Sequence, residues 1–156
     1  MKIGKTKISF DVYDKPPKKS QWGKDNAKLI IKLREAALKA RNDKGIKKYY
    51  TGHVKLNLIV YAPNITNLNY IQKDDDDPEK YIGDLDSLVA GVCDYIQKGP
   101  KEENLFTAHP SFKNKPEIAP DKALIIYDDS QIVEINAKKE PESNGTIHYH
   151  VEVTFL

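Results

Sequence analysis

VKLNLIVY, residues 54–61, has the sequence pattern of a β-strand. Its first residues alternate between apolar and polar side chains, with Val54, Leu56 and Leu58 set against Lys55 and Asn57. This period of two is typical of a β-strand that buries one face and exposes the other. Proline cannot donate to a strand ladder, so the strand ends before residue 63. We expect this strand to lie in a sheet whose buried face is covered by helices.

The chain before this stretch predicts one further strand and one helix. Residues 7–13 alternate in the same way, with Ile8, Phe10 and Val12 on one face. Residues 15–23 form a loop, because consecutive prolines interrupt any ladder. A helix is predicted over residues 25–42, with Asp25 or Asn26 as its cap and Gly45 just past its end. Its apolar stripe is Leu29, Leu33, Ala36, Ala37 and Ala40, and Lys28, Lys32, Lys39 and Arg41 lie outside it.

The chain after this stretch completes a single α+β domain that covers residues 1–156. Residues 62–82 are irregular, and a helix over 86–97 follows, with the stripe Leu85, Leu88, Val89, Val92 and Ile96. Residues 98–122 contain four prolines and many charges, so we expect an insertion outside the core. Residues 124–127, 131–138 and 147–155 are predicted strands, with a turn around 143–145. With residues 124–138 taken as one apolar run that two aspartates interrupt, the predicted order is β-α-β-α-β-β, a mixed sheet in two layers with both helices on one face.

Composition excludes several classes of protein. Hydrophobic residues make up 39% of the chain and charged residues 31%, as in ordinary soluble domains. No stretch approaches the ~20 apolar residues that a membrane span needs, and the first residues do not resemble a signal peptide. The single cysteine, Cys93, cannot form an intramolecular disulfide, and we interpret it as a core residue. These features favour a cytoplasmic protein that does not associate with membranes.

The net charge of +2 conceals a strong asymmetry along the chain. Residues 1–60 carry 16 lysines and arginines against 5 acidic residues, whereas residues 61–156 carry 9 against 18. This division is typical of a protein with a basic surface for a polyanion and an acidic region that holds cations. A lysine-rich helix that is simply well solvated gives the same composition, so the asymmetry alone does not identify a nucleic-acid-binding protein.

Two acidic clusters are candidates for a metal site. Asp84 and Asp86 stand at the predicted start of a helix, where a cap would require only one of them, and alternate residues of extended backbone project to the same side. Asp128 and Asp129 interrupt an apolar run, where a turn would also favour aspartate. Together they supply the hard oxygen ligands that Mg²⁺ or Mn²⁺ prefers. Beside a basic surface, these clusters favour metal-assisted phosphodiester hydrolysis.

The same residues resemble the RusA family of Holliday-junction resolvases over most of the chain. The family pattern has an Asp-x-Asp helix start, an aspartate further along that helix, an Asp-Asp-x-Gln element and a following lysine. The corresponding residues here are Asp84, Asp86, Leu88, Asp94, Asp128, Asp129, Gln131, Ile132, Val133 and Lys139. Residues 15–19 with Trp22 are similar to a proline- and lysine-rich loop of the family. The combination carries the resemblance, because each short motif is weak alone.

The resemblance implies an enzyme with particular residues in particular roles. Asp84, Asp86 and Asp129 would bind Mg²⁺ or Mn²⁺ and catalyse, with Asp94, Asp128 and Lys139 in support. The protein would act as a homodimer that nicks four-way DNA junctions. The family asparagine is replaced by Ser87, and the family's catalytic lysine by Ala90. Either Lys80 or Lys139 supplies the missing cation, or the activity is weak or absent.

The basic half suggests the DNA-contacting residues. We expect Lys15, Lys18, Lys19, Lys24, Lys28 and Lys32 to contact phosphates, with Trp22 stacking on a base or fixing the loop. We predict that the acidic run Asp74–Asp77 faces solvent. His148 and His150 share a strand face, but no third ligand for a metal ion is evident. Three functions remain open: a junction-resolving endonuclease, an inactive junction-binding protein of the same fold, and a carboxylate-metal phosphohydrolase for small substrates.

Overall fold

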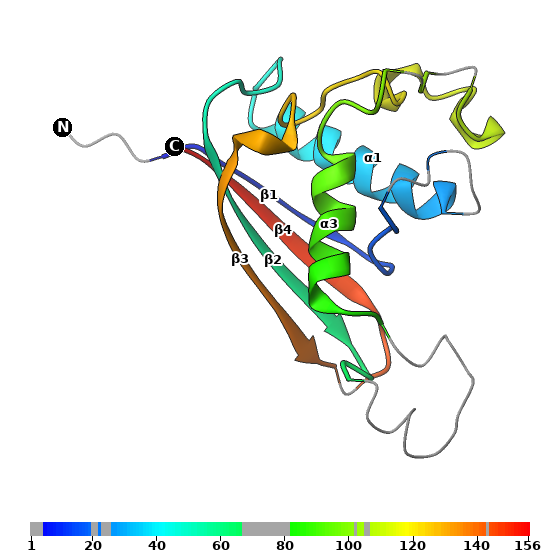
Figure 1. Cartoon of the computed structure of the whole chain (residues 1–156), viewed down its shortest axis with the longest axis vertical. Helices are drawn as coiled ribbons and strands as arrows, with labels where there is room; N and C mark the ends of the chain where they lie inside the picture. Colours follow the sequence, from blue (N-terminus) through cyan, green and yellow to red (C-terminus); the bar gives the residue numbers. More distant parts are fainter. Residues whose placement is uncertain are drawn as a thin grey trace.

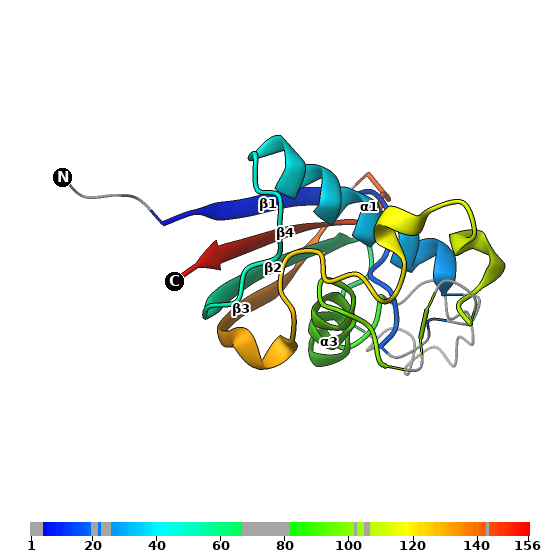
Figure 2. The ribbon, with the colours of Figure 1, turned by 90° about the horizontal axis from the view of Figure 1, so that it is seen from above.

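The computed structural model describes residues 5–19, 22, 26–66, 82–101, 103–104, 107–142 and 144–156. Among these residues a four-stranded mixed sheet forms one layer, and helices pack on one of its faces (Figures 1 and 2). The expected α+β class and single-domain architecture are therefore confirmed. The strands are β1 (Lys7–Val12), β2 (Val54–Ala62), β3 (Ile132–Pro141) and β4 (His148–Phe155). The helices are α1 (Ala27–Asp43) and α3 (Leu85–Tyr95), with the short 3₁₀ helices η2 (Pro110–Phe112), η3 (Pro116–Ile118) and η4 (Asp129–Gln131).

The strand order is β1-β4-β2-β3, so β2, which contains residues 54–61, is an inner strand of the sheet. It pairs antiparallel with β4 and parallel with β3, which leaves β3 at one edge. Val54, Leu56 and Leu58 are at most 1% exposed and face the helices. Helix α1 lies against β1, and α3 lies against β3 (Figure 1). The alternation along β2 therefore predicted correctly which side chains of this strand face the helices.

Helix α1 ends where the sequence predicts, but its buried face is rotated from the predicted stripe. Gly45 adopts φ +73°, and Ile46 N donates to Arg41 O at 3.1 Å, which satisfies a carbonyl at the helix end. The buried residues are Ala27, Ile30, Leu33, Arg34 and Ala37, whereas the predicted Leu29, Ala36 and Ala40 are only half-buried. The predicted stripe missed this rotation because it contains only apolar side chains and so leaves out Arg34.

The described residues of the segment 98–122 contribute to the core, which corrects the expectation of an excursion outside it. Phe112 and Ile118 are at most 1% exposed and join the main hydrophobic cluster. Arg34 of α1 holds the segment through its guanidinium, which donates to Ile118 O at 2.8 Å and Ala119 O at 2.7 Å. Its charges and prolines predicted a solvent-exposed loop, but a buried arginine and two apolar side chains tie it to α1.

Residues 124–127 do not form the strand that their apolar run predicts. They make only an isolated parallel bridge between Tyr50 and Ile126. Leu124 and Ile125 are nonetheless buried, because Ile125 N donates to Ile96 O at 3.1 Å and Ile125 O accepts from Tyr50 N at 2.8 Å. A short apolar run predicts burial reliably, but it does not decide between a strand and an irregular core segment.

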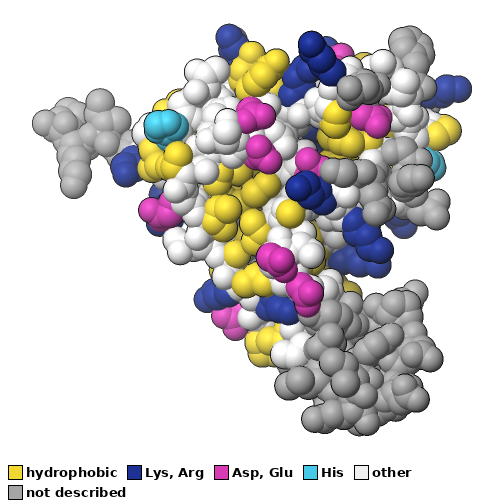
Figure 3. All heavy atoms as spheres, viewed as in Figure 1, with side chains coloured by type: hydrophobic (Ala, Val, Ile, Leu, Met, Phe, Trp, Pro, Cys, Tyr) yellow, Lys and Arg dark blue, Asp and Glu magenta, His cyan; other side chains and the backbone are white. Residues whose placement is uncertain are grey.

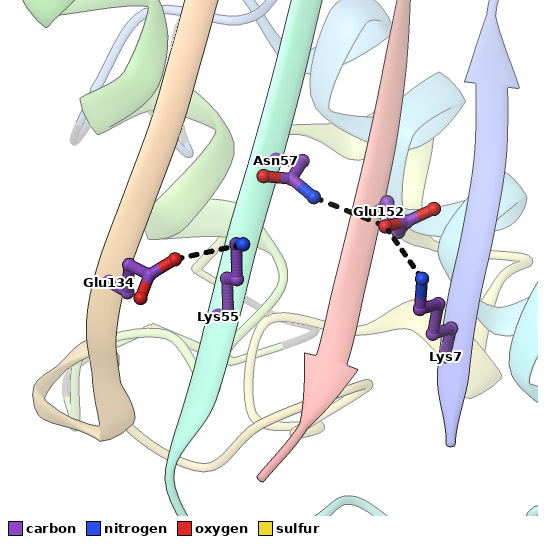
Figure 4. A network of polar contacts seen from close by, with 5 residues as sticks. All are labelled: Lys7, Lys55, Asn57, Glu134 and Glu152. Atoms are coloured by element: carbon purple, nitrogen blue, oxygen red, sulfur yellow. Dashed lines mark hydrogen bonds and ion pairs between the residues drawn. The ribbon is translucent and has the colours of Figure 1, made fainter. Parts of the chain in front are cut away.

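The sheet face opposite the helices is polar, and ion pairs cross it (Figure 4). Lys55 Nζ lies 2.9 Å from Glu134 Oε2, and Lys7 Nζ lies 3.7 Å from Glu152 Oε1. Asn57 Nδ2 donates to Glu152 Oε1 at 3.1 Å. The charges on this face therefore neutralise one another. In the described part of the chain, no helix is long and apolar enough to cross a membrane.

Candidate functional site

Asp84 and Asp86 lie at the start of α3, as the sequence predicts. Asp84 is the N-cap residue in an extended conformation (φ −75°, ψ 145°), and its side chain accepts no capping hydrogen bond. Asp86 follows in the first turn, and both side chains are exposed. Leu88 and Val92 anchor the helix in the core below them. The carboxylates thus stand at a positive helix end without being used by the cap.

The side chain of Lys139 places a positive charge at the start of α3. Its Nζ donates to Gly83 O at 3.0 Å, directly beside Asp84. The contact forms because the end of β3 lies beside the start of α3 (Figure 1). Gly83 adopts φ +115°, a conformation that other residues rarely accept, so glycine is required where the chain enters the helix. The predicted supporting lysine therefore lies next to two of the three predicted catalytic aspartates.

Asp128 and Asp129 lie before β3 and play different parts. Asp128 Oδ2 accepts from Ser130 N at 2.9 Å in a capping box that Gln131 completes. The hydrogen bonds from Ser130 hold the pKa of the Asp128 carboxyl below its usual value. Gln131 also donates to Tyr50 O at 2.7 Å, which fixes the turn to the chain before β2. Asp128 is thus a structural cap, and Asp129 keeps an exposed carboxylate.

Asp129 lies at the opposite end of α3 from Asp84 and Asp86. Its backbone N–H donates to Gln97 Oε1 at 2.7 Å, two residues past the end of the helix. The 11 residues of α3 span about 16 Å. Accordingly, no three acidic, histidine or cysteine side chains among the described residues are placed to hold one ion.

The expected convergence of Asp84, Asp86 and Asp129 is therefore not found within one chain. Its physical reason is the direction of α3, which runs opposite to β3 and carries its first residues away from the start of that strand (Figure 1). Two carboxylates, those of Asp84 and Asp86, remain together at the start of α3. Mg²⁺ in proteins is commonly held by one or two carboxylates together with water and substrate phosphates, so this pair would hold the ion with its substrate.

Asp129 instead shares the C-terminal end of α3 with Asp94. Burial, together with the negative charges of Asp129 and Asp94, raises the pKa of the Cys93 thiol to about 12. Both carboxylates are therefore close enough to act on this thiol. Cys93 is 7% exposed and unpaired by disulfide, as expected for a core residue. Its raised pKa excludes a thiolate nucleophile at neutral pH.

The proline- and lysine-rich loop packs against the middle of α3. Gly91 is required there, because an added Cβ would lie 2.0 Å from Pro17 O. Tyr95 Oη donates to Lys18 O at 2.5 Å, which fixes the loop one turn further along the helix. Lys18 and Lys19 themselves are exposed. They lie beside the face of α3 that carries Asp86, Ala90 and Asp94 at helical spacing. Sequence reasoning missed this placement, because no local pattern links residue 18 to residue 95.

The other predicted DNA-contacting residues are divided between surface and core. Lys15 and Lys28 are exposed, and Lys32 Nζ pairs with Asp14 Oδ2 at 2.8 Å. Lys24, Lys80 and the run Asp74–Asp77 lie outside the described residues. Trp22 is 2% exposed, which overturns the prediction that it stacks on a base. Its ring packs against Tyr95, Phe112 and the guanidinium of Arg34, so it fixes the loop instead.

His148 and His150 each have a partner on the outer face of the sheet. His148 stacks on Tyr61 with ring centroids 4.6 Å apart, and His150 Nδ1 lies 2.9 Å from Asp11 Oδ1. The two side chains are on the same strand face, but each is held by a different neighbour. This arrangement gives no support to a metal pair.

Acidic side chains occur at both ends of an apolar surface that follows α3 and β3 (Figure 3). One group lies toward the start of β3 and the other toward the start of α3, with hydrophobic side chains between them. No protein-family model matches the chain, and no curated protein matches it. The resemblance to RusA-type resolvases therefore rests on the residues themselves.

Proposed function

We propose that this protein is a metal-dependent, structure-selective DNA endonuclease that resolves four-way junctions. It acts in the cytoplasm as a homodimer, with Mg²⁺ or Mn²⁺ as the cofactor. The observation that carries the proposal is the contact between Lys139 Nζ and Gly83 O, which sets a cation beside Asp84 and Asp86 at a helix N-terminus. A metal-binding carboxylate pair, a lysine and a helix end together suit a phosphodiester group.

The position of the basic loop supports a polymeric substrate. Lys18 and Lys19 are exposed and lie against the same helix that carries the aspartates. A DNA backbone that crosses α3 would meet these cations before its scissile phosphate reaches Asp84 and Asp86. The lysines bind and orient the backbone by charge, and Lys139 neutralises the phosphate at the helix start.

A junction-binding protein without cleavage activity is the second candidate, and Ala90 favours it. The residue lies between Asp86 and Asp94 on α3, where its methyl group offers no cation to a phosphate. A phosphohydrolase for small substrates has less support. The described hollows of about 400 and 340 Å³ are lined by α1 and its neighbours rather than by the candidate aspartates.

Incubation with a synthetic four-way junction, with and without Mg²⁺, tests the proposal. We expect symmetric nicks that need Mg²⁺ and are absent on linear duplex of the same sequence. Asp86→Asn should abolish nicking while junction binding persists, because it removes a metal-binding charge and reduces repulsion of phosphate. Asp43→Asn, an exposed acidic change on α1, is the matched control and should cleave like wild type. Cleavage that survives Asp86→Asn would place the chemistry elsewhere.

The same assay separates the two candidates. Binding of the junction without cleavage in Mg²⁺ or Mn²⁺ identifies the non-catalytic protein. If the protein does not prefer the junction over linear duplex, either in gel shift or in cleavage, both the endonuclease and the junction-binding protein are excluded.

A further inference from the structure

Tyr127 presents an aromatic ring to solvent just before η4. Its side chain is 49% exposed, whereas residues 124–126 before it are buried. Its backbone is held on both sides, because Tyr127 N donates to Gln131 Oε1 at 2.8 Å and Tyr127 O accepts from Lys98 N at 3.3 Å. The ring therefore projects from a fixed part of the backbone, and one of its sides is open to a ligand.

A second aromatic ring and a cation reach Tyr127 from the link between α1 and β2. The ring centroids of Tyr49 and Tyr127 are 5.5 Å apart, with the rings tilted by 44°. Lys48 Nζ lies 5.4 Å from the centroid of the Tyr49 ring, within the range of a cation–π contact. Tyr50 N donates to Ile125 O at 2.8 Å, which ties the two segments together. We give the name basic–aromatic patch to the four residues Lys47, Lys48, Tyr49 and Tyr127.

The lysines of this patch are not neutralised by ion pairs. Lys47 and Lys48 are exposed, and neither pairs with an acidic side chain in the described part of the chain. The lysines that do form ion pairs lie elsewhere and are Lys7, Lys32, Lys39, Lys55, Lys115 and Lys138. Unpaired cations beside exposed aromatic rings are typical of surfaces that bind single-stranded nucleic acid, where cations follow the phosphates and rings stack on bases.

The patch lies apart from the lysines that the sequence suggests for DNA contact. Those lysines belong to residues 15–32, and their loop is fixed by Tyr95 Oη, which donates to Lys18 O. Tyr127 instead meets the chain at Lys98, beyond the end of α3. Residues 47–49 also belong to none of the stretches that resemble RusA-type resolvases. The patch is therefore a feature of this chain that neither the charge pattern nor the resemblance predicts.

We propose that the basic–aromatic patch binds an unpaired stretch of a DNA strand, with one base stacked on Tyr127 and the flanking phosphates on Lys47 and Lys48. In a duplex both faces of each base are covered by its neighbours, so a stacking ring selects unpaired nucleotides. The inference goes beyond the proposed function, because strand binding needs neither a junction nor a metal ion. Where it rests on that function, it predicts that the preferred junction has unpaired nucleotides at its branch point.

Fluorescence anisotropy with a labelled oligothymidylate of about 15 nucleotides, in EDTA, tests the patch. Tyr127→Ala should weaken binding about tenfold, because it removes one base–aromatic stack. Tyr127→Phe should bind like wild type, because the ring rather than the hydroxyl carries the contact. Tyr13→Ala is the matched control, since Tyr13 is 77% exposed but lies beyond β1 at the other edge of the sheet. Wild-type affinity in Tyr127→Ala would overturn the proposal.

An abasic strand of the same length separates stacking from charge. It keeps the phosphates but has no bases, so Tyr127→Ala and wild type should bind it equally. Lys48→Gln should weaken binding of both strands and reduce the magnitude of the salt slope by about 0.7. Lys113→Gln, an exposed change just after η2, is the control and should alter neither. Equal losses on both strands in Tyr127→Ala would indicate damage to the fold and would contradict base stacking.

Photocrosslinking locates the bound base on the unaltered chain. An oligothymidylate that carries 5-iodouracil should crosslink to Tyr127 or Tyr49, as identified by peptide mass spectrometry. Crosslinks confined to residues 15–32 would overturn the proposal. A polyglutamate peptide of equal charge should displace the strand poorly. Equal displacement would identify the patch as a general surface for polyanions, acidic proteins included, and would likewise overturn base recognition.

A junction with a short unpaired stretch at its branch point connects the patch to the proposed function. Wild type should bind it about tenfold more tightly than a fully paired junction, and Tyr127→Ala should lose this preference. The two ideas fail separately. A protein that binds oligothymidylate as expected but never nicks a junction loses the proposed function and keeps the patch. A protein that nicks junctions while Tyr127→Ala binds both strands like wild type keeps the function and loses the patch.

Discussion

Arg34 is the residue on which the packing of several segments depends. Its side chain is 0% exposed and donates to the carbonyls of Tyr95, Gln97, Ile118, Ala119 and Lys122 at 2.6–3.0 Å. Burial lowers the pKa of the guanidinium to about 9, so it remains protonated at neutral pH. No other side chain of the proteinogenic set presents five donors in one plane. Arg34 thereby joins α1, the end of α3 and the segment 98–122.

We expect Arg34→Met to lower the free energy of unfolding by about 3–5 kcal/mol, because it removes one donor group from five carbonyls, in four buried contacts and one part-buried contact. Urea denaturation followed by circular dichroism measures the loss. Lys39→Met is the control on the exposed side of the same helix, and it should stay within about 0.5 kcal/mol of wild type. Equal stability of Arg34→Met and wild type would contradict the assigned role.

Ala90 decides whether a positioned cation is missing from the site. It lies one turn after Asp86, so a lysine at this position reaches the same neighbourhood. If native cleavage is weak, Ala90→Lys should raise its rate by roughly 10²–10³, the contribution of one transition-state donor. Single-turnover cleavage of a four-way junction measures the change. Asn42→Lys, an exposed position on α1, is the control, and an equal gain there would indicate a general charge effect.

At the scale of elements, the contact between α3 and the proline-rich loop positions the lysines. Gly91→Ala should push the loop away from the helix, because the new Cβ would lie 2.0 Å from Pro17 O. Pro17 O is a backbone atom, so the clash is relieved only by a shift of the loop backbone. We expect weaker junction binding together with a stability loss of about 1–3 kcal/mol. Gel shift and denaturation measure the two effects. Ser87→Ala, exposed on the same helix, should change neither.

The link between η4 and the end of α3 positions Asp129. Gln97 is 8% exposed, and its side-chain oxygen accepts from the Asp129 N–H at 2.7 Å. Sequence reasoning did not select Gln97, because a lone glutamine at a helix end has no distinctive pattern. Only the approach of residues 128–131 to the end of α3 gives it a role. The same approach explains why Asp129 lies near Asp94 rather than Asp86.

For the whole molecule, the excess of lysine in the first part of the chain predicts salt-dependent DNA binding. If roughly five phosphates are neutralised per subunit, the logarithm of affinity should fall against the logarithm of salt concentration with a slope of about −4 to −5. The double variant Lys18→Ala, Lys19→Ala should reduce the magnitude of this slope by about 2. Lys39→Ala, whose lysine pairs with Asp43, is the control. Binding that does not depend on salt would exclude a phosphate-contacting surface.

Local sequence patterns predicted strands β1 to β4, helices α1 and α3 and the inner face of the sheet. Alternation in β1 and β2 identified which side chains face the helices, because residues i and i+2 of a strand share a face whatever the rest of the chain does. It also located Asp84 at the start of a helix and Gly45 past the end of another, since capping depends on a few neighbouring residues. These are local consequences of backbone geometry.

Which of these features lie side by side depends on how elements distant in sequence pack together. The direction of α3 relative to β3 places Lys139 beside Asp84 and keeps Asp129 at the other end of the helix. The burial of Arg34 and Trp22 likewise depends on partners 61–88 and 73–90 residues away along the chain, which no local pattern records. Strand alternation and helix capping depend on residues that are neighbours in sequence. A functional site depends on residues that are neighbours in space, and the packing of the helices on the sheet decides which residues those are.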